Sequence, residues 1–178
     1  MPEPKQATPK VLEMAVVTII LVAAFAYFAI ALNTQDILWF WPTYDELPRQ
    51  MIVHCYGSDI EVEPSSAFEA VNIAVNEALS GRKRWDQLTM SDETYQDYQD
   101  SPTMMVLELV YDPSVRIHSF YSFYKRITQM IIPLDGRHAS TNAIFGRLGD
   151  YNLSGSFHVN SIAPILEAVQ ENGICQMP

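Results

Sequence analysis

An uninterrupted apolar run near the amino terminus constrains this chain more than any other feature. Residues 14–32 read MAVVTIILVAAFAYFAIAL, nineteen residues whose only polar groups are the hydroxyls of Thr18 and Tyr27. A helix rises about 1.5 Å per residue, so this run covers about 28 Å, close to the roughly 30 Å hydrocarbon core of a bilayer. With the apolar residues just before it, the pattern predicts a transmembrane helix over residues 11–32.

Two other interpretations of the apolar run compete with a membrane span. A buried core helix is seldom apolar on every side over so many residues. A cleaved signal peptide has an apolar core of about 7–15 residues followed by a small-residue cleavage site. Here the run is longer and is followed by NTQDILWFWP, which contains no such site. We therefore expect a retained membrane anchor.

Aromatic residues crowd the segment that follows the predicted span. Residues 33–48 contain Trp39, Phe40, Trp41 and Tyr44, and we interpret this segment as an interfacial linker. Tryptophan combines apolar rings with a polar N–H and is stabilised at the membrane–water boundary. The four side chains are therefore expected at the membrane interface. The alternative is that they belong to a soluble core, where tryptophan is also often buried.

The charges on the two flanks of the span give its expected orientation. Lys5 and Lys10 precede the span, whereas the other flank carries three carboxylates and one cation, Arg49. Lysine and arginine favour the cytoplasmic side of a membrane. Residues 1–10 are thus predicted to be a cytoplasmic tail, and residues 49–178 an extracytoplasmic domain anchored in the cell (inner) membrane.

The charge balance excludes nucleic acid as a partner. The chain has 21 Asp and Glu against 11 Lys and Arg, a formal net charge of −10, and nucleic-acid binding requires a basic face. A basic cluster at 82–84, RKR, follows a predicted helix that ends at Gly81. Cations suit that end of a helix dipole, so the cluster is interpreted as a solvated helix end. The expected partners are membrane lipid and other protein subunits.

Two cysteines fall near the two ends of the outer domain. In an oxidising compartment Cys55 and Cys175 could pair, which would close a loop of about 120 residues. Buried free cysteine is also common, so the sequence leaves both possibilities open.

The domain is expected to fold as a single α+β unit with a mainly antiparallel sheet and two helices over one of its faces. The first helix follows Pro64, with Ser66 and Glu69 as a capping box and Gly81 as its stop. The second helix is expected between about Asn160 and Gly173. Residues 84–103 are polar and lack periodicity, so they are interpreted as a loop. Strands are expected at 50–57, 104–111, 115–124 and 127–133, with one or two more in 142–159. The strands 104–111 and 115–124 are expected to pair as a hairpin, with 112–114 as its turn.

Motifs that would carry catalysis or hold a cofactor were not found. His54 and Cys55 would point to opposite faces of a strand and so cannot form a dyad. The pattern SFYK at 122–125 matches the S-x-x-K of penicillin-recognising enzymes, but neither of their downstream motifs occurs. No nucleophile elbow, phosphate loop or dinucleotide fingerprint is present. The prediction is a non-enzyme with no cofactor, no metal and no small-molecule substrate.

The apolar segment also bears a resemblance to a known family. Residues 11–32, VLEMAVVTIILVAAFAYFAIAL, resemble the amino-terminal helix of type IV pilins and pseudopilins, in which a lone glutamate near the helix start precedes an apolar span. Glu13 is the matching position, and the match covers about 20 residues. Prepilins carry glycine five residues before that glutamate, at the cleavage point, whereas this chain has Thr8. The resemblance implies a filament subunit that is processed before Glu13.

A stripe of small residues on the span indicates contact with another helix. Small side chains on one helical face allow close helix–helix approach in membranes, and here they are Ala15, Thr18, Val22, Ala26 and Ala29. We therefore expect a non-catalytic accessory or assembly subunit of a larger membrane complex, for example a bacterial respiratory or photosynthetic assembly. The alternatives are a pilin-like filament subunit and an extracytoplasmic sensor domain, although a tail of ten residues is too short for a cytoplasmic output domain.

Overall fold

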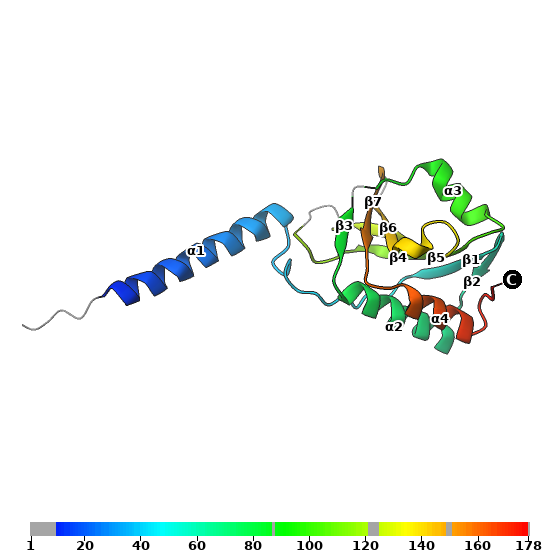
Figure 1. The fold of residues 1–178 in the computed structure, drawn as a ribbon, viewed down its shortest axis with the longest axis horizontal. Coiled ribbons are helices and arrows are strands. Elements are labelled where there is room, and N and C mark those ends of the chain that lie inside the picture. Colours follow the sequence, from blue (N-terminus) through cyan, green and yellow to red (C-terminus); the bar gives the residue numbers. More distant parts are fainter. Residues whose placement is uncertain (1–9, 87, 121–124, 149–150, 178) are drawn as a thin grey trace, which may run out of the picture.

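The long apolar helix α1 extends away from a folded α+β domain, to which residues 35–49 connect it (Figure 1). The structure is a computed structural model that describes residues 10–86, 88–120, 125–148 and 151–177, with the side chains of 151–154 left aside. Nearly all of the expected cytoplasmic tail, residues 1–9, therefore lies outside the described residues, as do Thr8 and the end of the strand expected at 115–124.

Helix α1 (Val11–Thr34) begins where the sequence predicted and continues two residues further. It is long and apolar enough to cross a membrane. Most of its side chains are exposed; Ala31 and Thr34, at the end next to the domain, are buried, and Ala24, Tyr27 and Ile30 are partly covered. Gln35 ends the helix in the left-handed conformation (φ 54°), and its backbone N–H donates to the carbonyl of Ala31.

A seven-stranded antiparallel sheet forms the centre of the domain, which confirms the α+β prediction. Its order is β2-β1-β4-β5-β6-β7-β3, so short strands lie at both edges. The bounds are β1 Gln50–Cys55, β2 Ser58–Glu61, β3 Arg84–Asp86, β4 Met105–Val115, β5 Ile127–Asp135, β6 Ala143–Leu148 and β7 Tyr151–His158. A short 3-10 turn, η2 (Ala139–Thr141), lies between β5 and β6.

Helices α2 (Ser66–Ser80) and α4 (Ala163–Glu171) cover one face of the sheet together. Helical periodicity places apolar side chains of both on the inner side. These helical side chains and alternate residues of the strands form the main core. The helices contribute Val71, Leu79 and Ile165, and the strands contribute Val53, Leu107 and Ile132. The cap of α2 is one residue earlier than expected, because the hydroxyl of Ser65 accepts the N–H of Phe68.

The opposite face of the sheet carries a helix within residues 84–103, whose polar sequence predicts a loop. Helix α3 (Asp92–Asp100) is capped by Ser91, whose hydroxyl accepts the N–H of Thr94 at 3.1 Å. It packs mainly through Tyr95 and Tyr98 on a smaller apolar cluster of the sheet. The two helices expected over one face are present as α2 and α4, whereas the interpretation of residues 84–103 as a loop was wrong. Two tyrosines in a nine-residue polar segment give too weak a periodic signal.

The expected hairpin across residues 112–114 was also wrong. Asp112, Pro113 and Ser114 lie inside β4, with a cis peptide bond before Pro113. The ladder between β4 and β5 skips this segment and resumes at Val115, which pairs with Ile127. A proline has no N–H to donate to a ladder and is tolerated at such an irregularity. The segment therefore interrupts a strand without reversing the chain.

Candidate functional site

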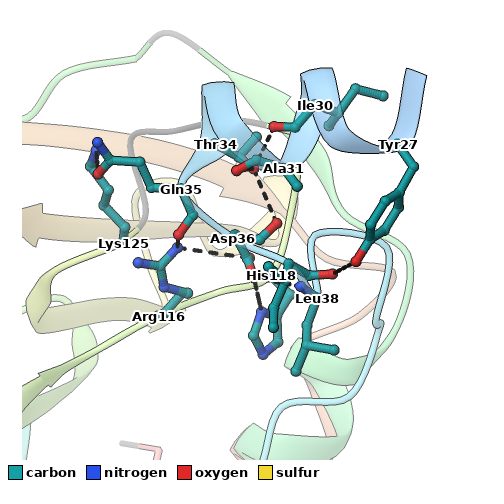
Figure 2. A network of polar contacts seen from close by, with 11 residues as sticks. Tyr27, Ile30, Ala31, Thr34, Gln35, Asp36, Leu38, Arg116, His118 and Lys125 are labelled. Atoms are coloured by element: carbon teal, nitrogen blue, oxygen red, sulfur yellow. Dashed lines mark hydrogen bonds and ion pairs between the residues drawn. The ribbon is translucent and has the colours of Figure 1, made fainter. Parts of the chain in front are cut away.

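A polar network around one buried carboxylate holds the end of α1 to the domain, and we take this junction as the candidate functional site (Figure 2). Its centre is the carboxylate of Asp36, which is only 7% exposed. The Nδ1 atom of His118 lies 2.9 Å from one carboxylate oxygen, and the guanidinium of Arg116 lies 3.9 Å away. Arg116 also donates to the carbonyl of Gln35 at 2.9 Å. Lys125 donates to the side-chain oxygen of Gln35 at 2.9 Å.

Local sequence explains why the chain turns here. The hydroxyl of Thr34 donates to the carbonyl of Ile30 at 2.9 Å, which satisfies an acceptor in the last turn of α1. Asp36 then accepts the backbone N–H of Leu38 at 2.9 Å, an arrangement typical of a turn. These contacts fix the exit of the chain before the domain begins.

The partners of Asp36 and Gln35 come from a segment 81 to 90 residues away. Arg116 and His118 follow β4 directly, and Lys125 precedes β5. A buried carboxylate is costly unless it is paired and hydrogen-bonded, so this geometry holds α1 and the β4–β5 connection together. Its chemistry suits mechanical coupling between a membrane helix and a domain, because every group in it is used in a contact that joins the two.

Breaking this junction should free the linker without unfolding the domain. We expect Asp36→Ala to lower the free energy of opening of the segment 35–48 by about 1–3 kcal/mol, because Arg116 and His118 lose their buried acceptor. Cleavage by a broad-specificity protease should then be roughly 5- to 150-fold faster. The control is Asp45→Ala, which removes an exposed carboxylate from the same linker. Equal cleavage rates for the two variants would show that the junction carries no coupling.

The aromatic linker lies back along the end of α1. The hydroxyl of Tyr27 donates to the carbonyl of Ile37 at 2.8 Å (Figure 2). The rings of Trp39 and Phe40 lie 6.5 and 6.1 Å from the ring of Tyr27. Phe40 and Trp41 are about half exposed. These three linker aromatics are thus gathered at the end of the domain from which α1 extends, and their contact with lipid stays a prediction.

Tyr44 does not belong with the other linker aromatics. Its side chain is 4% exposed and lies in the main core. Its backbone N–H donates to the hydroxyl of Ser80 at 2.8 Å, and that hydroxyl donates back to the carbonyl of Tyr44 at 3.1 Å. The expectation of an interfacial Tyr44 was wrong, because this part of the linker already packs against α2 and takes its ring out of reach of the membrane.

Cys55 and Cys175 are joined by a disulfide, with their Cα atoms 5.9 Å apart. Cys55 ends β1, and Cys175 follows α4, so the bond ties the carboxyl-terminal segment to the sheet beside the main core. The sequence left this pairing open, because the approach of residues 120 positions apart depends on the fold.

A second buried polar cluster lies between α3 and the sheet. Glu108 of β4 accepts hydrogen bonds from Tyr95 at 2.9 Å, Gln99 at 3.2 Å and Gln129 at 3.1 Å. The Nε2 atom of His54 lies 3.0 Å from the same carboxylate. On the other side of the ring, Nδ1 of His54 lies 2.7 Å from the exposed carboxylate of Asp59.

The ionisation of this cluster follows from its contacts. Burial alone would raise the pKa of Glu108, but hydrogen bonds from His54, Tyr95 and Gln99 hold that pKa below its usual value. Burial alone would lower the pKa of His54, but its bonds to Glu108 and Asp59 raise that pKa above the usual value. Both ring nitrogens of His54 are held by carboxylates, so the ring has no free nitrogen to act as a base. The arrangement suits a structural ion pair.

His54 and Cys55 point to opposite faces of β1, since one contacts Glu108 near α3 and the other bonds to Cys175 near α4. Lys83 of the basic cluster donates to the carbonyls of Leu79 and Gly81 at the end of α2, and burial lowers its pKa. Within the part of the chain that the structure describes, no group of three or more His, Cys, Asp or Glu side chains could hold a metal ion.

The small-residue face of α1 is uncovered by the rest of the described chain. All of its members are exposed: Ala15, Thr18, Val22, Ala26 and Ala29. Thr18 satisfies its own hydroxyl by donating to the carbonyl of Met14 at 2.8 Å. The face is therefore free for lipid or for another helix, and its role in packing stays a prediction.

Comparison with known proteins finds a similar fold and no family. No protein-family model matches the sequence, and no curated protein matches it. The fold is similar to that in the crystal structure of YycH from Bacillus subtilis, with a TM-score of 0.52 and 15% sequence identity. The similarity covers 74% of this chain and 38% of YycH, so this chain spans well under half of the length of that protein. With its one exposed apolar helix, the architecture is that of a single-pass membrane protein with an α+β domain.

Proposed function

We propose that this protein is a membrane-anchored, non-catalytic accessory or assembly subunit of a larger membrane protein complex, with its α+β domain outside the cytoplasm. The observation that carries the proposal is the combination of α1, an apolar helix that is exposed over most of its length, with the polar junction at Asp36. A flexible linker would suffice for a domain that is merely tethered. A fixed junction is useful where the domain must meet a partner at a set orientation above the membrane.

The extracytoplasmic placement has two supports. The disulfide between Cys55 and Cys175 favours an oxidising compartment, since reducing pools keep cytosolic thiols free. The two lysines before α1 favour a cytoplasmic amino terminus. Labelling of Lys5 or Lys10 from the cytoplasmic side of sealed vesicles would test this orientation.

A non-catalytic role is supported by how the polar groups of the domain are used. His54, the best-placed candidate base, has both ring nitrogens bound to carboxylates. Cys55 is in a disulfide and is not available as a nucleophile. The proposal therefore assigns the work of the domain to protein contacts.

Purification of the native protein in a gentle detergent, followed by mass spectrometry of what accompanies it, tests the proposal. We expect an intact amino terminus and partner proteins in fixed ratio. A chain shortened to a start near Pro9 and recovered in filaments would instead support the pilin-like alternative. Recovery of the intact chain alone would count against a complex subunit.

A substitution on the small-residue face makes the test sharper. Ala26→Phe should weaken association by about 1–3 kcal/mol, roughly 5- to 150-fold in affinity, because a large ring keeps the two helices apart. Ala24→Phe is the matched control, since Ala24 lies on the opposite side of the helix at 100° per residue. Quantitative co-purification with unchanged partner yield for Ala26→Phe would refute this packing face.

A further inference from the structure

We propose that the segment after β4, up to Phe120, and the aromatic part of the linker form a second membrane-contact element, through which the base of the domain docks on anionic lipid beside α1. The surface consists of Trp39, Phe40, Trp41 and Phe120, which we call the base patch, together with Arg116 and Arg126, which lie near Phe120 in the sequence. The proposal rests on α1 spanning the membrane, as proposed above. It adds a lipid-binding surface on the domain itself.

The first observation is the position of Phe120. Its ring lies 4.3 Å, between ring centroids, from the ring of Trp39, and its side chain is 58% exposed. Trp39 in turn contacts Tyr27 of α1. A large exposed apolar side chain from the distant β4–β5 connection thus continues the apolar surface of the helix. Contiguous exposed apolar surface of this kind marks an interaction site.

The second observation is the depth of the patch relative to α1. The hydroxyl of Tyr27 donates to the carbonyl of Ile37, at the start of the aromatic segment. Tyr27 precedes the end of α1 at Thr34 by seven residues, which is about 10 Å along a helix. The patch therefore lies level with the last two turns of α1, whose Phe28 and Leu32 are 61% and 78% exposed. If these turns contact lipid, the base patch has the same surroundings.

The third observation is the charge around Phe120. Residues 113–134 contain no Asp or Glu, although the whole chain carries 21 of them. The same stretch contains Arg116, Lys125 and Arg126. Asp36 faces Arg116 and offsets one positive charge, while Arg126 is exposed. Cations beside interfacial aromatics are typical of segments that bind anionic headgroups.

The geometry favours lipid over a protein as the occupant. At 100° per residue, Tyr27 lies about 140° around α1 from the middle of the small-residue face that includes Ala26. A partner helix packed on that face would therefore leave the Tyr27 side, and the patch next to it, turned toward lipid. Aromatic rings and cations are also the side chains that most favour the interface itself.

Depth-dependent fluorescence quenching tests the proposal in the full chain. The reporter chain carries W39F, W41F and F120W, and the baseline chain carries W39F and W41F only. Both retain Trp85, which packs on Phe157 in the domain at 5.3 Å between ring centroids and serves as an internal reference. Each chain is reconstituted in vesicles of phosphatidylcholine and phosphatidylglycerol, with and without phosphatidylcholine brominated on the upper part of its acyl chains.

We expect bromolipid to reduce the emission contributed by F120W by about half or more, because interfacial aromatics lie at headgroup level, while the baseline chain is unchanged. Adding Arg126→Glu to the reporter should weaken this quenching in vesicles that contain phosphatidylglycerol but not in pure phosphatidylcholine. Equal quenching of reporter and baseline would overturn the proposal. Protection of F120W from both bromolipid and aqueous acrylamide would also overturn it, since protein would then cover the patch.

Failure of the base patch can be told apart from failure of the membrane anchor. Near-ultraviolet circular dichroism first establishes that the reporter chain is folded. An unquenched reporter in a chain that resists alkaline extraction from the vesicles refutes the patch and leaves the anchor intact. Release of the chain by alkaline extraction refutes the anchor and the patch together.

Discussion

Removal of the disulfide should lower the free energy of unfolding of the domain by about 2–5 kcal/mol. The bond between Cys55 and Cys175 closes a loop across 120 positions, which is nearly the whole domain. Opening so large a loop returns conformational freedom to the unfolded chain, and this freedom grows with loop length. The variant Cys55→Ala with Cys175→Ala, unfolded by urea in mild detergent, should therefore have a clearly lower midpoint than the wild type.

The wild type with its disulfide reduced and alkylated is the companion measurement. It should lose a similar amount of stability, since the change to the unfolded chain is the same. In both samples the segment after α4 should also become sensitive to protease, because Cys175 ties it to β1. If both thiols of the untreated native protein react with an alkylating agent, the bond is absent and this expectation fails.

Truncation of Glu108 should destabilise the domain by about 3–5 kcal/mol, the second large effect that we expect. The carboxylate is 3% exposed and joins β4 to His54, Tyr95, Gln99 and Gln129. Glu108→Ala leaves the buried ring of His54 and several other donors without their acceptor, and breaking a buried pair on one side has a cost of this size. Urea unfolding measures it directly.

Glu61→Ala is a matched control, because it removes an exposed carboxylate from the edge strand β2. It should change the free energy of unfolding by less than about 0.5 kcal/mol. The double variant His54→Leu with Glu108→Leu should lose less than Glu108→Ala, since removing both charges leaves neither one unpaired. If Glu108→Ala is no worse than Glu61→Ala, the cluster contributes nothing to stability.

The pH dependence of stability gives the same cluster a distinct signature. The pKa of Glu108 is held below its usual value, so its contribution is present above the unfolded value of about 4.3 and is lost as the pH falls through the folded pKa. The pKa of His54 is raised, so its contribution is full below about 6.5 and is lost as the pH rises through the folded pKa. The contribution of His54 and Glu108 to the free energy of unfolding of the wild type should thus be largest between about pH 4.3 and pH 6.5. The variant His54→Leu with Glu108→Leu should lack this maximum.

Patterns confined to one segment were predicted well from sequence. The span follows from the absence of charged side chains over residues 14–32, and α2 follows from the spacing of Phe68, Val71, Val75 and Leu79. Helix α3 and the path of β4 through Pro113 were missed. Their local signals are weak or point the other way, and pairing of β4 with β1 and β5 overrides the turn preference of Asp112–Ser114.

The sequence by itself determined that this chain has one segment fit to span a membrane and a separate α+β domain, because periodicity and hydropathy are properties of consecutive residues. Only the tertiary structure decided which distant groups meet. It joined Asp36 to His118, Cys55 to Cys175, and Trp39 to Phe120, and it moved Tyr44 into the core. Such contacts link residues 36 to 120 positions apart, and they arise only when the order of strands in the sheet brings those segments together.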